Sequence, residues 1–406
     1  MRNNRTLAMV WGAAIGGLVA SAPALAIDDA HKEKAAKMAD KAAEFLRSKQ
    51  DKTQGGWAIP AKGPHTPAIS ALVINGLAMD PAAKNDDPVV ASGVQYLLRF
   101  QQPDGGIYDK TLPSYNTSIS LSALSKVNTP EARAAARKAQ EFLRRLQWSE
   151  DKDNRVGGAD ASEAVPKEHV FYGGVGYGNN GRPDNSNLSF MMQAMQDSGV
   201  SPDDPCVQRA LVFLRRTQMH EAVNDMPYAK GSHQGGFIYS TDEQARSVDD
   251  RGQPAGASQA GTIEESLDDG TKVSRLRAYG SMTYAGFKTL VYAQLPRDDK
   301  RVVVALDWIR HNYTLEENPG MGKDGMYYYY LAFARALGAW GQEKIEAFDP
   351  DGKPRPHDWA NDLIDRLATL QNEDGSFKSQ GNRWMEKDPV LITAYALIAL
   401  RTASPG

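Results

Sequence analysis

Three carboxylates stand beside amide and aromatic side chains at points where the chain could form a pocket. Asp184 precedes the string Asn-Ser-Asn, and Glu386 and Asp388 follow Trp384 in a second polar stretch. A carboxyl group held in apolar surroundings can stay protonated near neutral pH and act as a general acid. We therefore take Asp184, Glu386 and Asp388 as the candidate catalytic residues. The alternative is that each carboxylate only caps the start of a helix.

Similar stretches elsewhere supply side chains that could line a cavity. Aromatic rings present apolar faces together with a polar edge, which suits an isoprenoid or a sugar. The run of four tyrosines at 327–330 cannot point one way, so at most two of its rings can face a cavity. The candidate cavity residues are His65, Tyr115, Asn116, Asn185, Asn187, Tyr279, Tyr284, Tyr327, Tyr328 and Trp384.

The sequence offers no pattern for a bound metal or an organic cofactor. The 7 histidines show no ligand spacing, although His220 and His233 flank one turn and could meet. The single cysteine, Cys206, excludes disulfide frameworks and cysteine-bound clusters. Asp204, two residues earlier, is interpreted as a helix cap and Cys206 as a buried thiol. No G-x-S-x-G, H-E-x-x-H or phosphate-loop motif occurs, and we predict neither metal nor cofactor.

Composition narrows the classes of partner. The chain has 406 residues, 47 basic and 50 acidic side chains, and 41% hydrophobic residues. A nucleic-acid partner would require an excess of Lys and Arg, so none is expected. There is enough apolar material to bury a core. A hydrophobic small molecule or a glycan is the predicted partner, and a protein partner stays open.

Residues 1–26 have the layout of a secretory signal peptide. Arg2 and Arg5 precede an uncharged apolar run from Leu7 to Val19, and Pro23 stands before the small-x-small site Ala24-Leu25-Ala26. This order is typical of Sec-type export, and an uncleaved N-terminal anchor is the alternative. We expect an exported protein, periplasmic or extracellular, whose mature chain spans 27–406 as one domain. No later segment is long and apolar enough to span a bilayer.

Helices of two kinds should position the candidate residues. One kind carries an apolar stripe at i, i+3, i+4 and i+7, as in Ala139, Phe142, Leu143 and Leu146. The other kind is apolar or small on all sides, as in 390–400. Because an amphipathic helix covers a core and an all-apolar helix lies inside one, each unit should pair an outer helix with an inner helix. We predict an all-α fold, an (α/α)6 toroid of about six helical hairpins.

Turns of one composition join these helices. A Gln at the end of an outer helix is followed by a Gly pair or Gly-Ser and then by an aromatic or aliphatic residue. The instances begin at Gln50, Gln101 and Gln371, with a looser copy at Gln218. Glycine supplies the positive φ that stops a helix, and the aromatic ring can pack between neighbouring hairpins. We interpret these segments as repeat turns.

The strings QQPDGGIYD, LQNEDGSF and QGGFIYS resemble the Gln-Gly-aromatic repeats of the squalene cyclase and protein prenyltransferase superfamily. The resemblance covers essentially all of the mature chain and implies the toroidal fold and a central cavity for an isoprenoid lipid. It is much less specific for activity, because toroids of this type serve several chemistries.

The motifs that the resemblance would require for catalysis are missing. The D-x-D-D acid motif of terpene cyclases does not occur. The zinc-binding Asp and Cys of prenyltransferases would fall on Asn185 and Asn187, and neutral amides are poor zinc ligands. Whether the chain is an enzyme is therefore left open; if it is one, a terpene cyclase-like isomerase or lyase is implied.

Three functions fit these observations. The first is an exported squalene/terpene-cyclase-like toroid that binds or converts an isoprenoid lipid. The second is a carbohydrate-active or glycan-binding toroid, and the third is a non-catalytic scaffold for a protein partner. The stretch 241–277 departs from the repeat, being rich in Gly, Ser, Asp and Glu. It is interpreted as a polar insertion, either a flap over the cavity or a disordered loop.

Overall fold

The structure is a computed structural model, and it describes residues 27–405 except 81, 83–86, 152–163, 179–181, 242–256, 268 and 350. The predicted signal peptide, residues 1–26, lies outside the described residues. A continuous core of buried side chains extends from α1 to α12, the first and last helices.

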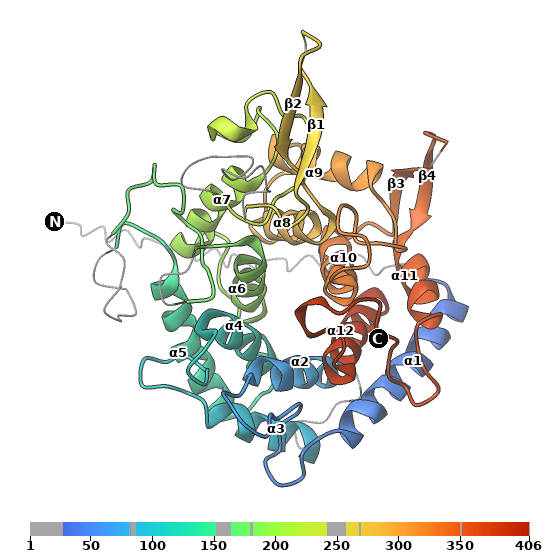
Figure 1. The fold of residues 1–406 in the computed structure, drawn as a ribbon. Coiled ribbons are helices and arrows are strands. Elements are labelled where there is room, and N and C mark those ends of the chain that lie inside the picture. The colour runs from blue at the N-terminus through green and yellow to red at the C-terminus, as the bar shows by residue number, and fades with distance from the viewer. Residues whose placement is uncertain are drawn as a thin grey trace, which may run out of the picture.

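Twelve α-helices of the described residues alternate along the chain between an outer and an inner position (Figure 1). The outer helices are α1 (Asp29–Ser48), α3 (Pro88–Leu98), α5 (Pro130–Leu146), α7 (Pro205–Thr217), α9 (Lys300–His311) and α11 (Trp359–Ala368). The inner helices are α2 (Pro67–Ala78), α4 (Pro113–Leu124), α6 (Asn185–Asp197), α8 (Gly280–Tyr292), α10 (Met326–Trp340) and α12 (Pro389–Ala403). Two short 3-10 helices, η1 (Pro227–Ala229) and η2 (Arg383–Met385), lie in the connections.

The two kinds of helix differ in burial as their sequences predict. In α5, the buried side chains form one stripe and the Arg and Glu side chains face outward. In α12, nearly every side chain from Val390 to Arg401 is buried. Outer helices begin at strong start signals: Asp87, Thr129 and Asp204 cap α3, α5 and α7, and a proline follows each cap.

The inner helices close into a ring. Each packs against the next along the chain, and α12 returns to pack against α2 (Figure 1). The outer helices surround this ring, and α11 contacts α1. The first and last helical pairs are therefore neighbours in the same way as any two consecutive pairs.

Glutamine side chains join neighbouring outer helices at five of the six junctions. The Nε2 group of Gln218 donates to the carbonyl oxygens of Gly235, in its own turn, and Arg301, in α9, each at 2.9 Å. Gln50, Gln101 and Gln371 bind the corresponding carbonyl oxygen of the next outer helix. Gln147 does the same, binding Gly173 and Cys206, and it was not predicted because its glycine pair comes 26 residues later.

Two separate constraints, the backbone angle and the space available, require glycine in each of these turns. Gly105 has a φ of +91°, a backbone conformation that residues with a Cβ rarely adopt. A Cβ on Gly105 would also lie 2.7 Å from the carbonyl oxygen of Lys138, in the next outer helix. The turn therefore brings two backbones into direct contact.

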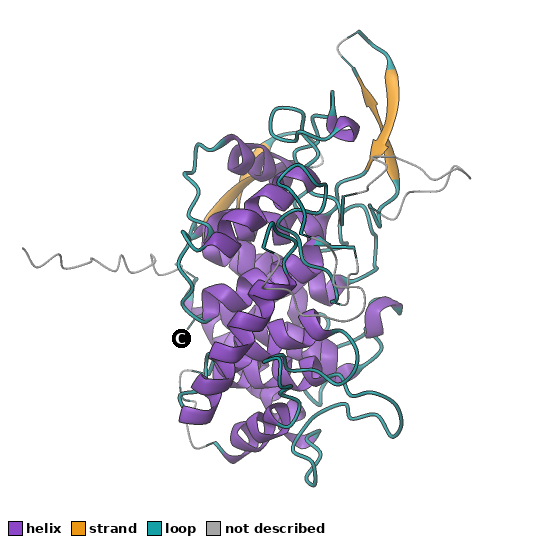
Figure 2. Cartoon of the chain, turned by 90° about the vertical axis from the view of Figure 1, so that its left-hand side faces the viewer, coloured by secondary structure: helices purple, strands orange, loops and turns teal. Residues whose placement is uncertain are grey.

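Two β-hairpins depart from the all-α expectation. Strands β1 (Thr262–Ser266) and β2 (Lys272–Leu276) pair antiparallel, as do β3 (Lys344–Phe348) and β4 (Pro354–Asp358). The first hairpin lies in the stretch 241–277 that was expected to be a flap or disordered, and it stands clear of the helices (Figure 2). Near the turn of this hairpin, Glu265 of β1 accepts hydrogen bonds from Ser232, His233 and Gln234.

No helix in the part of the chain that the structure describes is both long and apolar enough to cross a membrane.

Candidate functional site

A cavity of about 360 Å³ opens at the N-terminal ends of the inner helices. All six inner helices contribute to its wall, either by their first turns or by the residues just before them. The lining residues are Thr66, Ile69, Leu112, Tyr115, Tyr177, Ser186, Phe190, Tyr239, Gln259, Tyr279, Ser281, Met282, Gly325, Tyr328, Trp384, Met385, Glu386, Leu391 and Tyr395. Most of this wall is aromatic or aliphatic, so it suits a largely apolar ligand.

Tyrosine is the commonest residue in the wall. The hydroxyl groups of Tyr115 and Tyr395 lie 3.2 Å apart and share a hydrogen bond. The ring of Phe190 packs edge-on against Tyr115 at 5.2 Å and lies 5.5 Å from the ring of Tyr328. The wall is therefore a packed aromatic surface in which the phenol hydroxyl is the commonest polar group.

Glu386 is buried at the cavity and caps a helix that it does not belong to. Its carboxylate accepts backbone hydrogen bonds from Met326 at 3.0 Å, Tyr327 at 2.8 Å and Tyr328 at 3.3 Å, the first residues of α10. Burial raises the pKa of Glu386 to about 7, although the three N–H donors lower it. The carboxyl group thus titrates near neutral pH, as a general acid would.

Asp184 is fully buried behind the wall. It caps α6 and accepts hydrogen bonds from the backbone N–H and the side-chain amide of Asn187, both at 2.8 Å. Tyr239, which lines the cavity, lies beside Asp184 and lowers its pKa in part. Burial raises the pKa of Asp184 to about 6. This carboxyl group therefore adjoins a residue of the cavity wall.

Asp388, the third candidate acid, lies outside the residues that line the cavity. Its carboxylate caps α12 by accepting hydrogen bonds from the backbone of Val390 and Leu391. For this residue the alternative of a plain helix cap describes the observed contacts.

Four of the ten predicted cavity residues belong to the wall: Tyr115, Tyr279, Tyr328 and Trp384. His65 instead binds Asp109, with Nδ1 3.0 Å from the carboxylate, and packs against Phe100.

The three predicted asparagines form hydrogen bonds with other protein groups around the cavity instead of lining it. Asn116 joins the backbones of Thr111 and Ala68, the residues at two neighbouring inner-helix starts. Asn185 donates to the carbonyl oxygen of Ile238 and to Thr217. Asn187 binds Asp184. Amide side chains carry both donors and acceptors, so they suit such bridges.

Two predicted tyrosines also lie elsewhere. Tyr284 packs between Tyr329 and Phe333 in the core. Tyr327 points to the repeat turn, where its hydroxyl donates to the carbonyl oxygen of Lys378. Neighbouring residues of α10 therefore face different sides, as the helical period requires.

Several wall residues were not predicted from the sequence, above all Tyr177 and Tyr239. Both lie in connections that lead from the helices to the cavity, so the pattern of inner-helix starts did not reveal them. The only signal was the nearby Gly pair in each case, which marks a turn.

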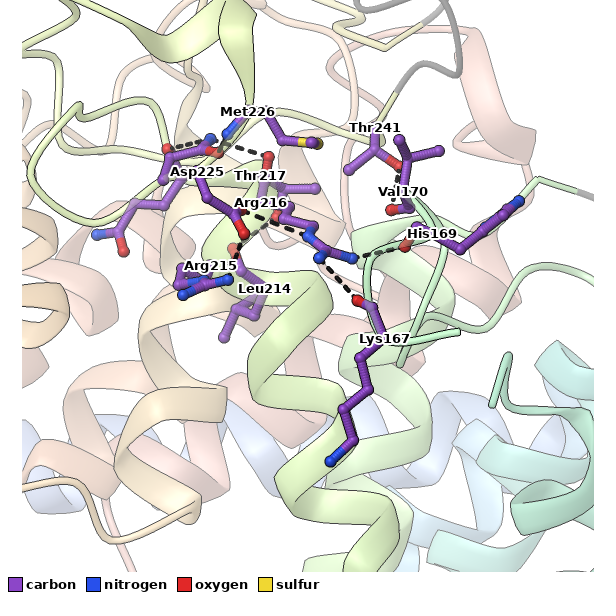
Figure 3. A network of polar contacts seen from close by, with 12 residues as sticks. Lys167, His169, Val170, Leu214, Arg215, Arg216, Thr217, Asp225, Met226 and Thr241 are labelled. Carbon is purple, nitrogen blue, oxygen red and sulfur yellow. Dashed lines mark hydrogen bonds and ion pairs between the residues drawn. The ribbon is translucent and has the colours of Figure 1, made fainter. Parts of the chain in front are cut away.

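A buried arginine fixes these two connections (Figure 3). The guanidinium of Arg216, in α7, donates to the carbonyl oxygens of Lys167 and His169 and reaches Asp225 at 3.4 Å. Thr241 donates to the carbonyl oxygen of Val170 at 3.0 Å. Because the segment 164–178 carries Tyr177 and the end at 241 carries Tyr239, this network holds both tyrosines in place.

The mouth of the cavity is apolar. Trp384 and Met385 line it with 49% and 55% of their surface exposed, and Tyr177 with 41%. Trp384 and Met385 also have φ values of 50° and 65°, which residues with side chains seldom adopt. Arg383 stacks over the Trp384 ring and pairs with Asp324 at 3.2 Å.

Among the described residues, no group of three or more His, Cys, Asp or Glu side chains could hold a metal ion. His220 and His233 do meet, with ring centres 5.5 Å apart. Cys206 is buried, and burial raises the pKa of its thiol to about 12. Asp204 caps α7 beside it, through the backbone N–H of Cys206.

No protein-family model and no curated protein matches the sequence. Solved structures match over nearly the whole chain. A variant of the type II terpene cyclase MstE from Scytonema, in complex with geranylgeranyl dihydroxybenzoate, has a TM-score of 0.51 at 12% identity and covers 93% of this chain and 99% of its own. The α-1,6-mannanase GH76A of Salegentibacter sp. HEL1_6, in complex with α-1,6-mannotriose, has a TM-score of 0.52 at 11% identity and covers 91% of this chain and 98% of its own. At such identities the likeness shows a fold of the α/α toroid type, shared by terpene cyclases and glycosidases.

Proposed function

We propose that the chain binds a small isoprenoid or similarly apolar molecule in the cavity at the N-terminal ends of its inner helices. The observation that carries this proposal is the composition of the wall, in which aromatic and aliphatic side chains from all six inner helices surround one space. The fold that the chain shares with the terpene cyclase supports the same reading. Apolar surface of this kind is stabilised by an apolar ligand that removes it from water.

The size of the cavity limits the ligand. At ~30 Å³ for each water-sized group, a volume of about 360 Å³ holds on the order of 12 such groups. That corresponds to a monoterpene or sesquiterpene, whereas squalene would fit only in part.

The contacts of the two buried carboxyl groups favour binding over chemical conversion. Both oxygens of Glu386 accept backbone hydrogen bonds, and both oxygens of Asp184 accept from Asn187. These bonds make both groups helix caps, of α10 and α6, and that role accounts for their positions without catalysis. The proposal therefore covers ligand binding alone, and the experiment below would reveal any chemical conversion of the ligand.

The proposal is tested by calorimetric titration of the mature chain, residues 27–406, with the hydrocarbon farnesene, and by native mass spectrometry of what copurifies. The matched variants are Met282→Trp, which fills the cavity, and Val303→Trp, at an exposed site on α9. We expect farnesene to bind wild type and Val303→Trp equally, and Met282→Trp at least about tenfold more weakly. Absence of binding by folded wild type would overturn the proposal, and new product masses after incubation would add catalysis to it.

A glycan ligand is the second candidate. It is favoured by the exposed ring of Trp384 at the mouth and by two carboxyl groups with raised pKa values near the same cavity, since glycoside hydrolysis uses a pair of carboxyl groups. The mannanase of the same fold type adds support. Retention or cleavage of α-1,6-linked mannan, with no binding of farnesene, would select this candidate.

We also propose that residues 1–26 direct export. The full chain with a C-terminal tag should be found outside the cytoplasm of a bacterial host in shortened form, and the chain lacking 1–26 should stay inside. Retention of the full chain in the cytoplasm would contradict export.

A further inference from the structure

Six tyrosines contribute hydroxyl groups to the cavity wall, more than any other residue type. This tyrosine cluster consists of Tyr115, Tyr177, Tyr239, Tyr279, Tyr328 and Tyr395. Their hydroxyl groups lie close enough to influence one another: Tyr328 interacts with Tyr115 and Tyr177, and Tyr395 with Tyr115 and Tyr328. Burial raises the pKa of every member. The cluster therefore presents neutral hydroxyl groups, each able to donate one hydrogen bond.

One of these hydroxyl groups lacks a proper partner. The buried hydroxyl of Tyr328 makes no hydrogen bond of acceptable geometry with the described residues. Burial raises the pKa of Tyr328, and the Ser186 side chain beside it lowers that pKa only in part. A buried polar group without a partner is unfavourable, so an oxygen atom of a ligand would satisfy it.

The charges around the cavity exclude an anionic head group. Among the described lining residues no side chain is cationic, and the ionisable carboxyl groups are Glu386 in the wall and Asp184 behind it. Arg383 at the mouth is already engaged by Asp324 and Gln259. Diphosphates are bound by clusters of cations or by metal ions, and this wall offers neither.

We infer that the ligand is an uncharged isoprenoid-sized molecule bearing a hydroxyl or carbonyl oxygen, held with that oxygen at Tyr328 within the tyrosine cluster. This inference rests on the proposed function and adds the chemical class of the ligand. The apolar part of the molecule would lie against Ile69, Met282 and Leu391, and the oxygen would accept the Tyr328 proton.

The experiment compares three probes that share one carbon chain: farnesene, farnesol and farnesyl diphosphate. Each is titrated into wild type, Tyr328→Phe and Tyr284→Phe. The last is a matched control, because the Tyr284 hydroxyl is also buried without a hydrogen-bond partner among the described residues but lies outside the wall.

We expect farnesol to bind wild type and Tyr284→Phe about tenfold more tightly than farnesene, which is the contribution of one hydrogen bond. In Tyr328→Phe this advantage should vanish, so that farnesol and farnesene bind about equally. The diphosphate should bind at least about 100-fold more weakly than farnesol, because its charges would lose water beside two carboxyl groups.

Equal binding of farnesol and farnesene by wild type, a farnesol advantage that survives in Tyr328→Phe, or tight binding of the diphosphate would each overturn the inference and leave the proposed function standing. If no probe binds to folded wild type, the proposed function fails and this inference fails with it.

Discussion

The side-chain amide of Gln371 donates a hydrogen bond of 2.9 Å to the carbonyl oxygen of Met38, although 333 residues separate the two. The same amide also binds Gly375 in its own turn. The last outer helix is thereby joined to the first by the contact that joins α7 to α9 through Gln218. The hydrogen bond that closes the ring is therefore of the same kind as those that join consecutive outer helices.

Replacing Gln371 should weaken the fold by opening this closure. Gln371→Ala removes both hydrogen bonds and leaves two carbonyl oxygens without a donor, so we expect a loss of about 2 kcal/mol in the free energy of unfolding. Urea unfolding followed by helical circular dichroism measures it. Gln95→Ala, at an exposed position on α3, is the control and should change stability by less than ~0.5 kcal/mol. Equal effects of the two changes would contradict the role given to Gln371.

The turn glycines should be more sensitive than other glycines with positive φ. In Gly173→Ala the new methyl group would overlap the carbonyl oxygen of Arg209 in α7, whereas in Gly199→Ala it would meet nothing within 4 Å. The φ values are similar, +84° and +76°, so backbone strain of about 1 kcal/mol applies to both. The overlap adds at least about 2 kcal/mol to Gly173→Ala alone, as thermal unfolding of the two variants would show. Similar melting temperatures of the two variants would mean that the backbones at residues 173 and 209 can move apart without a loss of stability.

Stability should fall as pH rises through neutrality, because the pKa of Glu386 is raised on folding from an ordinary 4.5 to about 7. Between these values the folded chain keeps a proton that the unfolded chain has lost, so the contribution of Glu386 is fully present below pH 4.5 and is lost as pH approaches 7. The loss amounts to about 3 kcal/mol, and Asp184 acts in the same direction at lower pH.

Urea unfolding across this pH range tests the titration. Glu386→Gln, which cannot ionise, should flatten the pH dependence, and Glu373→Gln at an exposed site should leave it unchanged. A wild-type stability that stays level or rises over this window, or an unaltered slope in Glu386→Gln, would refute the assignment.

Arg216 should influence ligand affinity without touching the cavity. Arg216→Met removes the guanidinium that binds the segment carrying Tyr177, so Tyr177 and Tyr239 would lose their fixed positions. We expect the dissociation constant for farnesol to rise about tenfold or more, measured by calorimetric titration. Arg215→Met is the matched control, because Arg215 also pairs with Asp225 but is partly exposed, with 38% of its side chain accessible. Unchanged farnesol affinity in a folded Arg216→Met would show that other contacts hold the loops.

The helical pairs could be predicted from the sequence because the buried positions of a helix are occupied by apolar residues at regular spacing. The stripe of α5 and the all-apolar run of α12 are local patterns, and so is the turn that follows Gln371. The strands β3 and β4 were missed because each has only five residues: β3 buries Ile345 and Ala347 between exposed neighbours, a pattern too short to be recognised, and β4 is largely exposed.

The cavity was predictable only where it is built by helix starts. Tyr115, Tyr279 and Tyr328 fall there, and they line the cavity. Tyr177 and Tyr239 lie in connections between helices. The paths of these connections depend on hydrogen bonds from Arg216 and Asn185, which are distant in sequence. Asn185 and Asn187 have the residue types of a binding site, but their amides are bound to Ile238 and Asp184.

Closure has a consequence for how this molecule comes apart. An open helical array has two end units with a single neighbour each, and such arrays fray from their ends and need polar caps. Here α12 packs on both α1 and α2, so every pair is flanked on both sides. The first step of unfolding must therefore break two interfaces at once. A nick in any one connection would leave a ring that still holds itself together, so the order of the helical pairs along the chain could be rotated without changing the fold.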